Sequence, residues 1–175
     1  MFVAGQTWQP LGQIRILPAN RSPSQTQLVP SEALPLHIQF GDSIELVATS
    51  LPEHTTYSPG DVVPLTLYWR AIGTPLDAYK VFVHLLGQEP NPASGNSIWG
   101  QQDQIPGGTL PTSSWLPGDQ VADAYAIPID PASPPGEYTV QVGLYQPRTG
   151  QRLSAISPDG TSLGDSVAIL TIKIP

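Results

Sequence analysis

The chain has 175 residues, of which 39% are hydrophobic, and this length and composition suit one globular domain with a core of its own. Its 21 prolines and 16 glycines interrupt helices, and no long window repeats apolar residues at helical spacing, so the sequence predicts an all-β fold. Fourteen acidic residues against seven basic ones give a net charge of −7, which excludes nucleic acid as a partner because phosphates would be repelled.

The first part of the chain, residues 6–31, is rich in proline, glutamine and serine. It has one short apolar stretch, residues 14–17, which is too little to fold alone. We expect residues 1–33 to form a linker that can lend an edge segment, and residues 34–175 to form the β-sandwich domain. No window is long and apolar enough to span a bilayer, so we expect no membrane insertion by this chain itself.

Nine segments with strand-like composition follow, at spacings typical of hairpins. They are residues 36–40, 43–49, 62–71, 79–86, 98–104, 120–129, 138–146, 152–156 and 167–174. In the third and seventh segments apolar and polar residues alternate, so that one face packs and the other meets water. The pattern predicts an immunoglobulin-like or fibronectin type III-like β-sandwich of about 7–9 strands.

Three of these segments start after the same short motif: Pro59-Gly60-Asp61, Pro117-Gly118-Asp119 and Pro135-Gly136-Glu137. Proline fixes φ at the first central position of a tight turn, and glycine accepts the positive φ of the second. We therefore expect each copy to be a turn that leads into a strand.

Two aromatic residues are expected to serve the fold. Trp69 falls on the inward stripe of its strand and is predicted to lie in the core. Tyr138 stands just inside a strand after a turn, where related sandwiches place a corner tyrosine whose hydroxyl bonds back to the preceding loop. The alternative is an ordinary core tyrosine.

Four segments together resemble one bacterial domain family: LTLYWRA (65–71), YKVFVHLL (79–86), PTSSWLPGD (111–119) and PPGEYTVQVGLYQPRTGQRL (134–153). They look like the β-sandwich domain found after the transmembrane part of membrane glycosyltransferases of the dolichyl-phosphate-mannose protein mannosyltransferase kind. The resemblance covers roughly residues 40–174. It implies an extracytoplasmic accessory domain, at the cell surface or in a periplasm-like compartment, with the membrane glycosyltransferase region as partner in cis or in trans. The family's catalytic residues lie in its membrane region, so none is carried over.

Catalytic chemistry is not expected from the residues themselves. The chain has no cysteine, its histidines are limited to His37, His54 and His84, and there is no G-x-S-x-G motif to present a serine nucleophile. The histidines also lack the close spacing of metal ligands. We predict no catalytic residue, no metal site and no cofactor, so the chain is not predicted to be an enzyme.

Sugar binding is the more plausible activity. Trp99 and Trp115 flank a long segment that also carries Gln101 and Asp103. Exposed rings can cover the apolar faces of a sugar while amides and carboxylates bind its hydroxyls. The alternative is that both rings plug the ends of the sandwich. If the strands at 79–86 and 98–104 form a hairpin, His84 comes near Gln101 and Asp103, and a hydrogen bond from His84 to Asp103 becomes possible.

Three functions therefore stay open at the level of sequence. The first is a non-catalytic accessory domain of a membrane glycosyltransferase, and the second is an independent carbohydrate-binding module for cell-surface polysaccharide. The third is a structural spacer. A binding module of the kind outlined here needs Trp99 and Trp115 exposed on one concave surface, whereas a spacer needs them buried.

Overall fold

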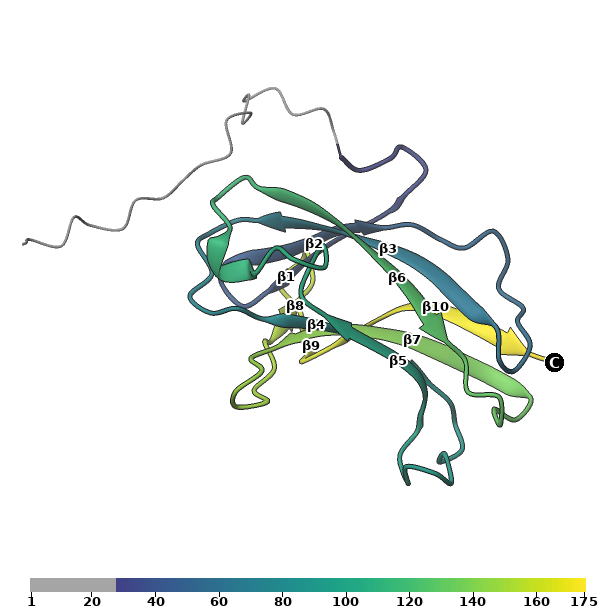
Figure 1. Ribbon diagram of the computed structural model, residues 1–175. Coiled ribbons are helices and arrows are strands. Elements are labelled where there is room, and N and C mark those ends of the chain that lie inside the picture. The colour runs from purple at the N-terminus through teal and green to yellow at the C-terminus, as the bar shows by residue number, and fades with distance from the viewer. Residues whose placement is uncertain (1–27) are drawn as a thin grey trace, which may run out of the picture.

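The computed structural model describes residues 28–175, which fold into two antiparallel β-sheets packed face to face (Figure 1). The elements are β1 (Leu34–Phe40), β2 (Ile44–Thr49), β3 (Val62–Ala71), β4 (Lys80–Leu86), β5 (Ile98–Gln104), the 3-10 turn η1 (Thr112–Ser114), β6 (Gln120–Pro128), β7 (Gly136–Tyr145), β8 (Ala155–Ile156), β9 (Ser162–Gly164) and β10 (Val167–Ile174). The predicted all-β sandwich is confirmed. The prediction missed β9, whose three residues are all exposed and carry no alternating pattern, so the described residues contain ten strands.

The strand order identifies the type of sandwich. One sheet has the order β6-β3-β2-β1-β8-β9, and the other has the order β10-β7-β4-β5. In immunoglobulin-like terms, β2, β3 and β6 occupy the places of strands A, B and E, while β4, β7 and β10 occupy those of C, F and G. Strand β5 then takes the C′ position beside β4. The connection from β7 to β10 crosses to the larger sheet, where β8 pairs with β1.

The core between the sheets is built from the inward residues of both. Trp69, from the stripe on β3, is 1% exposed and packs edge-on against Phe40 of β1, with ring centroids 5.9 Å apart. The alternation of β6 is complete, since every second residue from Val121 to Ile127 is buried. Burial of the apolar inward residues of both sheets provides the main driving force for packing one sheet on the other.

Tyr138 lies near the start of β7, the F strand. Its ring is buried, and its hydroxyl donates a hydrogen bond to the carbonyl oxygen of Pro134 at 2.7 Å. This is the hydrogen bond of a tyrosine corner, which ties the strand to the loop before it.

The first two Pro-Gly-Asp motifs form matching turns. Their glycines have φ angles of 90° and 91°. In the first turn Asp61 N donates to Ser58 O at 3.0 Å, and the Asp61 carboxylate accepts from Ser58 N at 2.7 Å. Leu116 and Asp119 repeat both bonds in the second turn, at 2.9 and 2.8 Å. The acidic residue therefore closes the turn before the strand begins.

The third motif differs, because Gly136 has the positive φ predicted for it but the turn expected at Pro135-Gly136 is not found there. Gly136 is already the first residue of β7, and its φ of 159° is close to fully extended. The turn lies earlier, where Ser133 N donates to Asp130 O at 2.9 Å. Pro134 precedes another proline, and a residue before proline favours extended conformations. The backbone is therefore already extended before Gly136.

β1 begins at Leu34. Of the predicted linker at residues 1–33, residues 1–27 lie outside the described residues, and residues 28–33 form no strand. Within residues 28–175 no helix has the length and hydropathy needed to cross a membrane.

Candidate ligand-binding site

A cleft of about 500 Å³ opens where β5 begins and β6 ends. It lies between the β4–β5 loop, the first residues of β5 and the segment that follows β6. Its lining residues are Asn91, Ala93, Ser94, Asn96, Ile98, Trp99, Gly100, Gln101, Pro128, Ile129, Asp130 and Pro131. Two of the ligand-binding residues predicted from sequence, Trp99 and Gln101, are among them.

Hydrogen bonds from Asn91 join the two sides of the cleft. Its side-chain nitrogen donates to Asp130 Oδ2 at 3.0 Å and to Ile98 O at 3.2 Å, and its backbone nitrogen donates to Asn96 O at 2.7 Å. Asp130 N in turn donates to Trp99 O at 2.7 Å. The cleft is therefore held open by the protein's own bonds, which reduces the ordering that a ligand would have to induce.

Gly100 allows the two sheets to approach at this point. A Cβ atom at this position would lie 2.3 Å from the carbonyl oxygen of Pro128, far inside van der Waals contact. Because β5 belongs to the smaller sheet and β6 to the larger one, any side chain here would push the edges of the sandwich apart. The shape of the cleft thus depends on glycine at position 100.

Asp130 is the charged side chain of the cleft. Its carboxylate accepts hydrogen bonds from Ala132 N at 2.8 Å and from the Asn91 amide. These two donors hold the pKa of Asp130 below its ordinary value of 3.8. The group is therefore a negatively charged acceptor at neutral pH.

Trp99 and Trp115 do not form the exposed aromatic surface considered from the sequence. Their side chains are 3% and 2% exposed, and their indole nitrogens donate to Glu89 O at 2.8 Å and Leu110 O at 3.2 Å. Trp115 lies shortly before the start of β6. The carbonyl oxygen of Trp99 accepts a hydrogen bond from Asp130 N, which lies just after the end of β6. Nine strand residues separate these ends by about 30 Å, so the rings lie at opposite ends of the sandwich.

A bulge explains why Trp99 turns inward. In the β4–β5 pairing Leu86 faces Ile98 and Leu85 faces Gly100, which leaves Trp99 as an extra residue. The bulge shifts the alternation by one, so that Trp99 enters the core while the later odd-numbered residues of β5 face outward. Simple period-2 counting would place Trp99 on the same face as Gln101 and Asp103, and it fails at this bulge.

His84, Gln101 and Asp103 do come together, on the outer face of the smaller sheet. His84 lies directly opposite Gln101 on β5 and Gln141 on β7. His84 Nε2 is 3.4 Å from Asp103 Oδ1, so the hairpin brings the two side chains into contact. Neither Gln101 nor Gln141 makes a side-chain hydrogen bond within residues 28–175.

The surroundings of His84 favour the neutral imidazole. Burial lowers its pKa below the ordinary 6.5, the Asp103 carboxylate opposes this shift, and Arg152 adds to it. The Arg152 guanidinium lies 4.2 Å above the ring of Phe82, which contacts His84. The contact between His84 and Asp103 thus joins a neutral ring to a carboxylate and holds the outer face of the sheet in shape.

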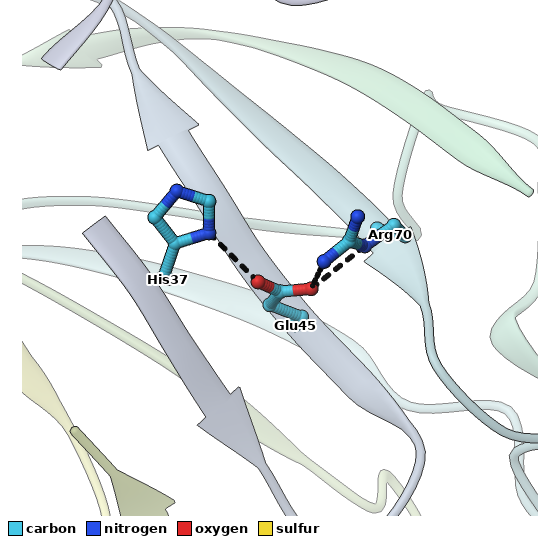
Figure 2. A network of polar contacts seen from close by, with 3 residues as sticks. All are labelled: His37, Glu45 and Arg70. Atoms are coloured by element: carbon cyan, nitrogen blue, oxygen red, sulfur yellow. Dashed lines mark hydrogen bonds and ion pairs between the residues drawn. The ribbon is translucent and has the colours of Figure 1, made fainter. Parts of the chain in front are cut away.

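A second polar cluster, which the sequence did not suggest, lies on the outer face of the larger sheet (Figure 2). Glu45 is 7% exposed and sits between His37 Nδ1, at 2.9 Å, and Arg70 Nε, at 2.7 Å. Glu45 and Arg70 are direct partners in the β2–β3 register. His37 occupies the bulge of β1 with a φ of 53°, and its bond to Glu45 anchors that strained residue.

Asn91 and Asp130 were not predicted as site residues from the sequence. Each comes next to proline, and each side chain accepts a hydrogen bond from the backbone nitrogen two residues on, at 2.9 Å and 2.8 Å. Asn-Pro and Asp-Pro pairs are signals for such turns. That signal predicts two local turns, but not that they meet across β5.

Within residues 28–175 no group of three or more His, Asp or Glu side chains is arranged to hold a metal ion. No protein-family model matches the chain, and a search of the curated proteins found no match.

Proposed function

We propose that this chain is a non-catalytic, extracytoplasmic accessory domain of a membrane glycosyltransferase, in which it positions glycan or acceptor beside the membrane enzyme. The proposal starts from the resemblance of four sequence segments. These segments supply β3, β4, the η1 turn with the residues before β6, and β7. They include Trp69, Trp115 and Tyr138, all buried, so the resemblance rests on residues that form the sandwich.

The cleft beside Asp130 is the observation that favours a positioning role. It is open and preformed, and it combines apolar lining residues with the polar side chains of Gln101 and Asp130, which is the usual make-up of a small-molecule site. The partners of the histidines fit a structural role: His37 contacts Glu45, His84 contacts Asp103, and His54 packs on the ring of Tyr57. None of these contacts, within the described residues, pairs a histidine with a hydroxyl nucleophile.

The test is a glycosyl-transfer assay on membranes that contain the glycosyltransferase, with residues 34–175 present in the same chain, absent, or added back as separate protein. We expect removal to raise the KM for the acceptor while hydrolysis of the donor lipid continues, because positioning affects acceptor binding and not the membrane catalytic site. An unchanged KM contradicts the proposal, and so does complete loss of donor hydrolysis that added domain restores. Protease digestion of intact cells checks that the domain is outside the cytoplasm.

An independent carbohydrate-binding module is the second candidate, and the same cleft supports it. A domain of that kind binds cell-surface polysaccharide without any glycosyltransferase. Retention of the isolated domain on cell walls from strains that lack the transferase would favour this alternative. The burial of Trp99 and Trp115 instead suits a spacer, the third candidate, and neither observation excludes the accessory role.

A further inference from the structure

We infer that the cleft between the β4–β5 loop and the segment after β6 binds one neutral sugar unit, with Asp130 and Gln101 contacting its hydroxyl groups. The inference deepens the proposed function, on which it rests in one respect: the sugar belongs to the glycan that the domain positions. The ligand class follows from the hydrogen-bonding capacity, the apolar surface and the charge of the cleft.

The polar groups of the cleft match hydroxyls. Both carboxylate oxygens of Asp130 are fixed by one hydrogen bond each, from Ala132 N and from Asn91, and each keeps a free lone pair. Two such oxygens can accept from neighbouring hydroxyls of a sugar ring. Gln101 lines the same cleft, is exposed, and uses neither its amide oxygen nor its amide nitrogen within the described residues. It can therefore donate to one hydroxyl and accept from another.

The apolar part of the cleft comes from aliphatic residues. Pro128 and Pro131 are exposed on one side, and Ile98 is partly exposed beside them. Flat proline rings can cover the C–H surface of a sugar, although with less attraction than an aromatic ring provides. The volume, about 500 Å³, falls in the range of small-molecule sites.

Charge excludes the competing ligand classes. Asp130 is the one charged side chain among the lining residues, and the whole chain carries −7, so phosphates and acidic sugars would be repelled. A cationic ligand would need an open aromatic face or further carboxylates, but the Trp99 ring is buried and bonded to Glu89 O. A neutral, hydroxyl-rich ligand remains.

The rigidity of the site supports specific recognition. Asn91 is buried and ties Asp130 to the start of β5, and the missing side chain at Gly100 lets the two edges meet. The groups that would contact the sugar are thus fixed before it arrives, so little conformational entropy is lost on binding.

The experiment is an amide NMR titration of the full chain with the methyl glycosides of glucose, mannose and galactose, with glucuronic acid and glucosamine as charged comparisons. We expect at least one neutral sugar to shift the amide signals of Gly100, Gln101 and Ala132 in a saturable manner. Glucuronic acid is expected to leave them unchanged, and glucosamine to bind no better than the neutral sugar.

Two variants locate the site. Gln101→Ala removes an exposed amide with no bonds in the described structure, and it is expected to weaken binding about fivefold, the effect of losing one neutral hydrogen bond. Gln141→Ala is the matched control, because it removes a glutamine from the same sheet face outside the cleft, and it should leave the affinity unchanged. Asp130→Asn tests the need for an anionic acceptor and should weaken binding further.

The inference is overturned if no neutral sugar shifts these signals, if Gln101→Ala and Gln141→Ala bind equally well, or if the charged sugars bind best. The outcome of the NMR titration can be distinguished from the outcome of the glycosyl-transfer assay. Saturable sugar binding with an unchanged acceptor KM would reject the glycosyltransferase role and support sugar binding in the cleft. A raised acceptor KM without sugar binding would reject sugar binding in the cleft and support the accessory role.

Discussion

At the scale of single residues, most buried polar side chains have specific hydrogen-bond partners. Asp123 is the clearest case, since it points into the core from β6 and is 0% exposed. Its carboxylate accepts hydrogen bonds from Tyr125 Oη at 2.6 Å, Gln104 Nε2 at 2.7 Å and Gly107 N at 2.9 Å. The Trp69 indole N–H lies close enough to lower the pKa of Asp123 as well, although it has no hydrogen bond of ordinary geometry in the described residues. A buried carboxylate needs such donors because its desolvation is costly.

Replacing Asp123 by asparagine should change how stability depends on pH. Burial raises the pKa of Asp123 above its ordinary 3.8, and its hydrogen bonds only partly oppose this. The folded state then binds the proton more tightly than the unfolded chain does. The resulting stabilisation is complete below the ordinary pKa and is lost as the pH rises through the raised pKa.

We therefore expect the unfolding free energy of the wild type, relative to Asp123→Asn, to fall as the pH rises above about 4. Urea unfolding of both proteins across the acidic and neutral range measures this difference, in which the other carboxyl groups cancel. A difference that stays constant with pH, or that grows, would contradict the assignment.

The tyrosine corner should be detectable as a single hydrogen bond. Tyr138→Phe keeps the ring in the core but leaves Pro134 O without its partner. We expect a loss of about 1 kcal/mol in unfolding free energy, measured by denaturant titration. Tyr68→Phe is the control, because the Tyr68 hydroxyl makes no hydrogen bond within residues 28–175, and it should change stability little. Equal losses in the two variants would argue against a corner.

At the scale of elements, glutamines join the edges of the two sheets. Strands β5 and β6 are edge strands of different sheets. Gln102 Oε1 accepts from Ala126 N at 2.8 Å, and Gln104 Nε2 donates to Ala124 O at 3.1 Å. The two glutamines also bond to each other at 2.9 Å. These side chains satisfy backbone groups that an edge strand would otherwise offer to another chain.

This arrangement predicts a local change in hydrogen exchange. In Gln102→Ala the Ala126 amide loses its acceptor, so its exchange with deuterium should accelerate while the amides that β6 directs toward β3 keep their protection. Gln101→Ala, next to it but facing outward, should leave the Ala126 amide unaffected. Exchange read by NMR at single-residue resolution distinguishes the two variants, and identical rates in both would show that Gln102 does not protect this amide.

At the scale of the whole molecule, the buried hydrophobic residues of the described part, residues 28–175, fall between Ile38 and Ile174. We therefore expect a chain that starts at residue 28 to unfold in one transition, with a midpoint within about 3 °C of the full chain, by thermal denaturation followed by circular dichroism. A chain that starts at Asp42 should be far less stable, because it lacks β1 and the fully buried Phe40. A large drop for the first truncation would mean that the segment before residue 28 contributes to the core.

Most of the fold could be predicted because its signals are local. The strands were located by alternation and by turn residues, and the first two Pro-Gly-Asp motifs formed the turns that their residues require. The failures have particular causes. β9 is too short and too exposed to carry a pattern, and Gly136 follows two prolines that had already extended the chain.

The site could be predicted only in part, because it depends on residues far apart in the chain. The hairpin brought His84 to Asp103, but the bulge at Trp99 reversed the face of that ring. The cleft forms where Asn91 bonds to Asp130 and where Gly100 meets Pro128 O. The sequence alone determined nine of the ten strands, two of the three Pro-Gly turns and the class of sandwich, since each depends on neighbouring residues. Only the tertiary structure decided that the tryptophans are buried and that Asp130 and Gln101 share a cleft, because those facts depend on how the two sheets approach each other.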